Sequence, residues 1–134
     1  MKKLLFFLLL IPVSIYCQET EKHPIDKFLD RCMEKDYSTH GMLNCLNEVF
    51  EKWDVELNKV YNELKDMLDE SGKKKLKDSQ LEWIKFRDKE FEFIDYLYSQ
   101  KDGTMYLTMR VSDRVEVVRK RALELQSYID VLEY

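Results

Sequence analysis

Apolar residues recur every three or four positions through most of the chain, and this spacing predicts amphipathic helices rather than strands. Glycines at positions 41, 72 and 103 interrupt a sequence that is otherwise compatible with helix. We therefore predict four helices, over about residues 24–36, 39–70, 73–99 and 104–132. Because short connections make successive helices antiparallel, the expected fold is all-α. It is an up-and-down antiparallel bundle of three long helices, preceded by a short helix.

The first seventeen residues follow a different pattern. Lys2 and Lys3 precede a short apolar run from Leu4 to Val13, which is typical of a secretory signal peptide and shorter than a membrane span. We therefore expect residues 1–17 to be a signal peptide and residues 18–134 to form a single helical domain. The expected location is the periplasm or the medium outside the cell.

Cys17 leaves two ways of processing this leader. Cleavage after Cys17 would release a soluble protein that starts at Gln18. Cleavage before Cys17, followed by its lipidation, would make an outer-envelope lipoprotein, and any membrane contact would depend on that lipid. A lipobox has a small residue directly before the cysteine and usually leucine two places earlier, but Tyr16 and Ser14 occupy these positions. The sequence therefore favours the released form.

The two other cysteines, Cys32 and Cys45, are predicted to form a disulfide. Two cysteines in an exported chain usually pair. Cys32 lies about one turn before the end of the first predicted helix, and Cys45 about one turn after the start of the second. In an antiparallel hairpin these positions face each other. The bridge would close a loop of about fourteen residues and contribute on the order of 3 kcal/mol, enough to fix a short helix with few apolar residues.

Composition excludes several classes of function. The net charge is −4, and removing a leader with two lysines and no acidic residue makes it −6. With three glycines and two histidines, neither a phosphate-binding glycine loop nor a Cys/His zinc framework can be assembled, so no cofactor is expected. A basic stripe in the last helix alternates with acidic residues, which indicates a solvated face and not a nucleic-acid site. This stripe contains Arg110, Arg114, Arg119, Lys120 and Arg121.

Polar residues also interrupt the apolar faces. Gln80 and Arg87 follow the apolar stripe of the third predicted helix, so they are expected to point towards the core. Pairing the second helix with the third across their hairpin places Asp54 and Asn58 nearest to Arg87, with Asp88 and Tyr61 as alternative partners. A buried guanidinium needs such acceptors. We interpret the set as a hydrogen-bonded network that determines helix register.

A catalytic interpretation of the same residues is weaker. The predicted register places Asp54 near Glu90, and two carboxyl groups can act as an acid–base pair. Such a pair needs a cleft, which a narrow helical interface does not offer. We therefore do not expect an enzyme.

Two motifs in these helices resemble the LprI-type lysozyme-inhibitor family. The first is D-x-x-L-N-x-x-Y and the second is Q-x-x-W-x-x-x-R-D, and together with the upstream cysteines the resemblance covers about residues 30–126. The matching positions are Asp54, Leu57, Asn58, Tyr61, Gln80, Trp83, Arg87 and Asp88. The resemblance implies a small helical domain of the bacterial envelope that inhibits lysozyme, and it does not imply catalysis.

The chain departs from this family at one point. Members often carry a cysteine soon after the R-D pair and another in the last helix, and these two cysteines form a bridge. Here Phe91 occupies the first position and a residue near Asp113 the second. We therefore expect the contact between the third and fourth helices to depend on packing alone.

The resemblance and the charge favour a protein-binding module whose partner is lysozyme or another basic protein. An acidic exported domain would be steered electrostatically towards such a partner. Two loops are candidate contact sites, the Ser71 to Lys75 tip and the Lys101 to Thr104 turn. Their candidate residues are Lys73, Lys74, Lys75, Lys101, Asp102 and Gly103. The alternative is a structural or interaction protein of the envelope that does not inhibit lysozyme.

Overall fold

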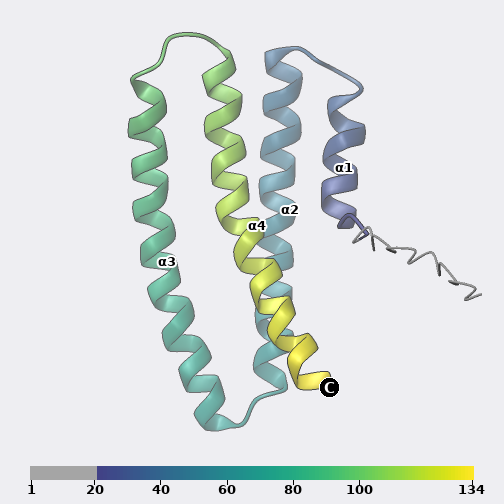
Figure 1. Ribbon diagram of the computed structural model, residues 1–134, viewed down its shortest axis with the longest axis vertical. Helices are drawn as coiled ribbons and strands as arrows, with labels where there is room; N and C mark the ends of the chain where they lie inside the picture. Colours follow the sequence, from purple (N-terminus) through teal and green to yellow (C-terminus); the bar gives the residue numbers. More distant parts are fainter. Residues whose placement is uncertain (1–20) are drawn as a thin grey trace, which may run out of the picture.

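The computed structural model describes residues 21–134, which form four α-helices and no strand. The helices are α1 (Pro24–Met33), α2 (Thr39–Asp66), α3 (Glu70–Ser99) and α4 (Met105–Glu133). Figure 1 shows α2, α3 and α4 running up and down, with α1 beside the upper half of α2. The predicted all-α bundle is confirmed. The proposed signal peptide and Cys17 lie outside the described residues.

The helix boundaries follow local capping chemistry. Ser38 caps α2 and Asp69 caps α3, because the side chain of each accepts a hydrogen bond from the backbone N–H three residues later. Gly72 was predicted to lie in a loop, and this prediction was wrong. The backbone N–H of Gly72 donates to Oδ1 of Asp69 at 2.7 Å. α3 therefore begins at Glu70, and the tip that was predicted to be a loop is part of this helix.

The hydrophobic core lies between α2 and α4. Val49, Trp53 and Val60 on α2 are almost completely buried, and so are Val118 and Leu125 on α4. These residues recur at helical spacing on each helix, so one apolar stripe packs against the other. The α2–α4 seam is therefore the main packing interface of the bundle.

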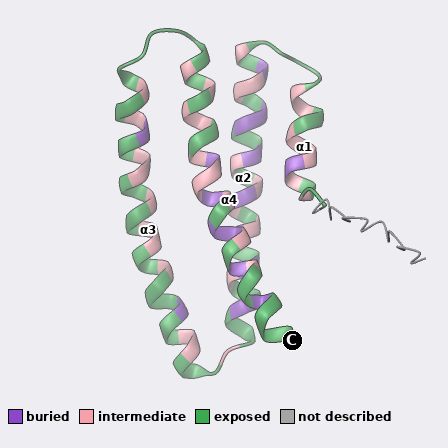
Figure 2. Cartoon of the chain, viewed as in Figure 1, coloured by how far each residue is buried: buried purple, intermediate pink, exposed green. Residues whose placement is uncertain are grey.

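Helix α3 lies at the edge of this core. Only two of its side chains, Leu76 and Ile94, are buried, and Figure 2 shows α3 as mostly exposed or intermediate along its length. Gln80 and Arg87 follow its apolar stripe, and both are only partly buried, so polar side chains occupy part of the face that packs on the bundle. No helix in residues 21–134 has the length and apolar character needed to cross a bilayer.

Helix α1 is attached to the bundle by a disulfide and an ion pair. The predicted Cys32–Cys45 bridge is present, with the two Cα atoms 5.8 Å apart. Near the start of α1, the carboxylate of Asp26 accepts hydrogen bonds from Arg119 of α4, from Nε to both oxygens at 3.1 Å and from Nη2 to Oδ2 at 2.8 Å. Hydrogen bonding to Asp26 raises the pKa of the Arg119 guanidinium above its ordinary value. Both ends of α1 are thus anchored.

We expect replacement of Cys32 and Cys45 together by serine to lower the free energy of unfolding by about 3 kcal/mol, because the unfolded chain then regains the entropy of a short closed loop. Urea denaturation of the variant and the oxidised protein measures the difference. The reduced native protein is the matched control and should behave like the variant. Equal stability of all three would contradict a structural role for the bridge.

Asp26→Asn should lower the free energy of unfolding by about 1–3 kcal/mol, because Arg119 then loses its charge-assisted partner in a partly buried site. The control is Asp30→Asn on the same helix. Asp30 pairs with Lys22, and half of its side chain is exposed, so its replacement should change stability by less than about 1 kcal/mol. Thermal and urea unfolding measure both variants. A similar loss of stability in both would show that the Asp26–Arg119 pair contributes no more than an exposed surface pair.

Candidate functional site

A buried arginine connects α3 to α4. Arg121 on α4 is only 7% exposed, and its guanidinium makes three side-chain hydrogen bonds. Nε donates to Oε1 of Gln80 at 3.0 Å, Nη2 to Oγ of Ser79 at 3.2 Å, and Nη1 to Oε2 of Glu124 at 2.6 Å. The charge is thereby compensated at the edge of the core, as a buried guanidinium requires.

Arg87 was predicted to be the central arginine of such a network with Asp54 or Asn58 as its nearest acceptor, and this prediction was wrong, whereas its alternative partner Asp88 is confirmed. The Arg87 side chain is about one quarter exposed, and its Nη2 donates to the neighbouring Asp88 at 2.7 Å. Asn58 donates to the backbone oxygen of Asp54 on its own helix, at 2.8 Å. No hydrogen bond or ion pair within residues 21–134 joins Asp54 to Arg87. The predicted register paired α3 with α2, whereas α3 has its polar anchor on α4.

The role of Arg121 was missed because the basic residues of α4 were interpreted as one solvated stripe. A signal was nevertheless present in the sequence. Arg121 follows Val118 by three positions and precedes Leu125 by four, so it shares the apolar face of the helix. Arg119 was missed for the same reason, and its partner is Asp26.

The contact between α3 and α4 also includes polar interactions where packing alone was expected. The Tyr98 hydroxyl donates to Oδ2 of Asp113 at 2.6 Å, and this hydrogen bond raises the pKa of Tyr98. The Arg114 guanidinium lies 4.5 Å from the ring centre of Phe91. These contacts join α3 to α4 through polar and cation–π interactions at Phe91 and Asp113.

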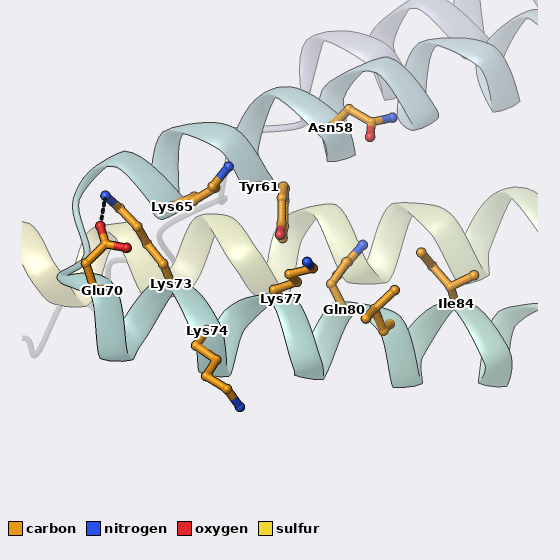
Figure 3. Close-up of a pocket in the computed structure, with 10 residues that line it drawn as sticks. Asn58, Tyr61, Lys65, Glu70, Lys73, Lys74, Lys77, Gln80 and Ile84 are labelled. Carbon is orange, nitrogen blue, oxygen red and sulfur yellow. Dashed lines mark hydrogen bonds and ion pairs between the residues drawn. The ribbon is translucent and has the colours of Figure 1, made fainter.

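An open groove of about 650 Å³ lies between α2 and α3 near their connection (Figure 3). We call it the α2–α3 groove. Most of its lining residues are polar or charged, and they are Asn58, Tyr61 and Lys65 on α2, and Glu70, Lys73, Lys74, Lys77, Gln80, Leu81 and Ile84 on α3. The groove therefore has a strongly basic end near the connection, whereas the other end carries amide, aromatic and aliphatic groups.

The family-motif residues divide between this groove and the rest of the bundle. Asn58, Tyr61 and Gln80 line the groove. Leu57 is buried in the core. Trp83 is half-buried, with the guanidinium of Arg121 5.9 Å from its ring centre. The motif was interpreted as purely structural, but three of its residues are also accessible from outside the bundle.

The lysines of the predicted tip project from a helix. Lys73 pairs with Glu70 at 2.9 Å and Lys74 with Asp78 at 3.1 Å, while Lys75 is exposed. Hydrogen bonding to Glu70 raises the pKa of Lys73. All three lie in the first two turns of α3.

The second candidate loop, with Lys101, Asp102 and Gly103, connects α3 to α4 and is exposed. Gly103 has φ of 116°, a conformation that favours glycine. This loop lies at the opposite end of the bundle from the α2–α3 connection (Figure 1). The length of α3 separates the two by about 45 Å, so one small interface cannot include both. No cluster of metal-ligating side chains is present in residues 21–134.

We expect Gln80→Leu to lower the free energy of unfolding by about 1–3 kcal/mol, because Nε of Arg121 loses its acceptor inside the protein. When Arg121 is already methionine, the same change should cost much less, and a double-mutant cycle on urea denaturation measures this coupling. Gln126→Leu on α4 is the control, since the amide of Gln126 donates at the surface to Asp130 on its own helix and has no other side-chain partner within residues 21–134. Additive effects of the two substitutions would contradict the network.

Comparison with known proteins identifies a family for this arrangement. A family model described as lysozyme inhibitor LprI matches residues 31–125, and no curated protein matches the chain. Among solved structures, the crystal structure of an uncharacterized protein from Burkholderia thailandensis is similar, with a TM-score of 0.77 and 27% identity. The match covers 84% of this chain and 56% of that one. Because the family model spans most of the sequence, the chain belongs to the lysozyme inhibitor LprI family.

Proposed function

We propose that this protein is exported and inhibits lysozyme by binding it as a folded module, without catalysis of its own. The observation that carries the proposal is the family match, which runs from α1 into α4 and includes both motifs. The Cys32–Cys45 disulfide supports export, because such bridges persist in oxidising compartments. Residues 1–17 would be the signal peptide, and residues 18–134 the released domain.

The charge of the domain favours this class of partner. Without residues 1–17 the net charge is −6, and an acidic surface accelerates encounter with a basic protein, such as the common lysozymes. Long-range attraction of this kind brings the partners together but does not determine which surface makes the contact.

The end of the bundle formed by the α2–α3 connection is the proposed contact. Lysozyme hydrolyses glycans with a pair of carboxyl groups in a cleft. Lys73, Lys74 and Lys75 carry positive charge at this narrow end, so they suit an acidic cleft. The opposite end, with Lys101 and Asp102, has mixed charge and offers less complementarity.

We expect purified residues 18–134 to inhibit lysozyme at micromolar concentration or below, in a titration of lytic activity with complex formation followed in parallel. Replacing Lys73, Lys74 and Lys75 together by glutamine should weaken inhibition about tenfold or more, because one desolvated charge pair alone contributes about that factor.

The control for this experiment replaces Lys85 and Lys89, which pair with Glu82 and Glu92 in the middle of α3, and it should leave inhibition nearly unchanged. Equal weakening of inhibition in both variants would show that Lys73, Lys74 and Lys75 do not form the contact with lysozyme. Absence of inhibition at large excess would favour the alternative, an envelope interaction protein that shares the fold but does not inhibit lysozyme.

A further inference from the structure

Two lysines of the α2–α3 groove lack an acidic partner. Lys73 and Lys74 each pair with a neighbouring carboxylate on α3, Glu70 and Asp78, whereas neither Lys65 nor Lys77 forms an ion pair within residues 21–134. Glu70 is the only acidic residue among those lining the groove. The groove is therefore a local positive region on a chain whose net charge is negative, and it favours an anion.

The buried network determines which way the amide of Gln80 points. A guanidinium has five donors and no acceptor, so the Gln80 oxygen must face Arg121, as observed at 3.0 Å. The NH₂ group of Gln80 then faces the groove, and it makes no hydrogen bond to another side chain in the described part of the protein. Arg121 thus orients a hydrogen-bond donor towards a ligand.

Tyr61 completes this group of donors from the opposite wall. Figure 3 shows its ring extending from α2 across the groove, with the hydroxyl directed towards Lys77 and Gln80 on α3. A ligand placed between the two helices would receive hydrogen bonds from the amide of Gln80 and the hydroxyl of Tyr61, and a carboxylate on it would receive them from the ammonium group of Lys77. Hydrogen bonds of this charge-assisted kind are short and strong.

The shape of the groove favours a small chain-like ligand over a protein surface. Its lining on α3 extends from Glu70 to Ile84, about 21 Å along the helix. Its volume of about 650 Å³ is in the range of small-ligand sites. Beyond the lysines, the ring of Tyr61 and the side chains of Leu81 and Ile84 offer apolar surface, against which the face of a sugar ring can pack.

We propose that the α2–α3 groove binds a carboxylate-bearing oligosaccharide. Lys65 and Lys77 pair with the carboxylate, Gln80 and Tyr61 donate to sugar oxygens, and Leu81 and Ile84 contact a ring face. This inference goes beyond inhibition of lysozyme and does not depend on it, because it concerns a small ligand. Muramic acid of the bacterial wall and uronic acids of other glycans share this chemistry.

Isothermal titration calorimetry of residues 18–134 tests the proposal with three saccharides of equal length: a muramic acid oligosaccharide, a uronic acid oligosaccharide and a neutral chitooligosaccharide. Saturable binding of either acidic saccharide, at least about tenfold tighter than the neutral one, supports the proposal, because the ammonium groups select the charge. The saccharide that binds identifies the source. No saturable binding of the acidic saccharides at millimolar concentration, or equal binding of the neutral one, overturns the proposal.

The decisive variant is Gln80→Glu. A carboxylate at this position still accepts from Arg121, so folding stability should be preserved or increased, but the donor in the groove is replaced by a negative charge. Binding of the acidic saccharide should therefore fall more than tenfold with no loss of stability. Lys77→Gln should also weaken binding about tenfold. Lys85→Gln, which lies on α3 outside the groove, should leave it unchanged.

Unchanged saccharide binding in a stable Gln80→Glu variant would overturn the assignment. A polyglutamate peptide provides the remaining comparison. If it binds in the groove more tightly than both acidic saccharides, the site serves protein carboxylates and the saccharide proposal is wrong.

Discussion

Trp53 lies where α1, α2 and α4 meet, and its side chain is completely buried. The ring of His23, at the start of α1, lies 4.4 Å from its ring centre, and the guanidinium of Arg119 lies 5.6 Å away. Its indole N–H makes no hydrogen bond within residues 21–134, which costs about 1–3 kcal/mol. Loss of a buried aromatic side chain of this size costs about 3–5 kcal/mol, so burial of the ring outweighs the unpaired donor.

This central packing explains why the short first helix needs two attachments. α1 has only ten residues and covers Trp53 from one side, so its own apolar area is small. The disulfide at one end and the Asp26–Arg119 pair near the other keep it in place. The covalent bond acts mainly on the unfolded chain, whereas the ion pair orients the folded helix.

Helix α3 is joined to the bundle in a different way, and this difference creates the groove. Two buried apolar residues and the Arg121–Gln80–Ser79 network connect it to the rest of the bundle. A fully apolar interface with α2 would close the space between the two helices. Because the main anchor of α3 is polar and lies on α4, the lysines and Tyr61 can face each other across an open volume. Gln80 contributes to both features, because its amide oxygen accepts from Arg121 in the network and its NH₂ group faces the groove.

The sequence alone determined the helical class, the number of helices, the disulfide between Cys32 and Cys45, and the family through its two motifs. These features depend on residue spacing over a few helical turns or on pairing between helices that are neighbours in the sequence. Both can be deduced from the order of the residues, without knowing how distant parts of the chain pack. The start of α3 was missed by about three residues, because the Asp69 cap was not recognised. Only the tertiary structure decided that α2 packs on α4 while α3 lies at the edge. It also decided that Arg121 and not Arg87 is buried, and that three motif residues line a groove. Helical periodicity shows which face of a helix is apolar but not which helix covers it, and a long arginine side chain reaches whichever acceptors the packing brings within its range.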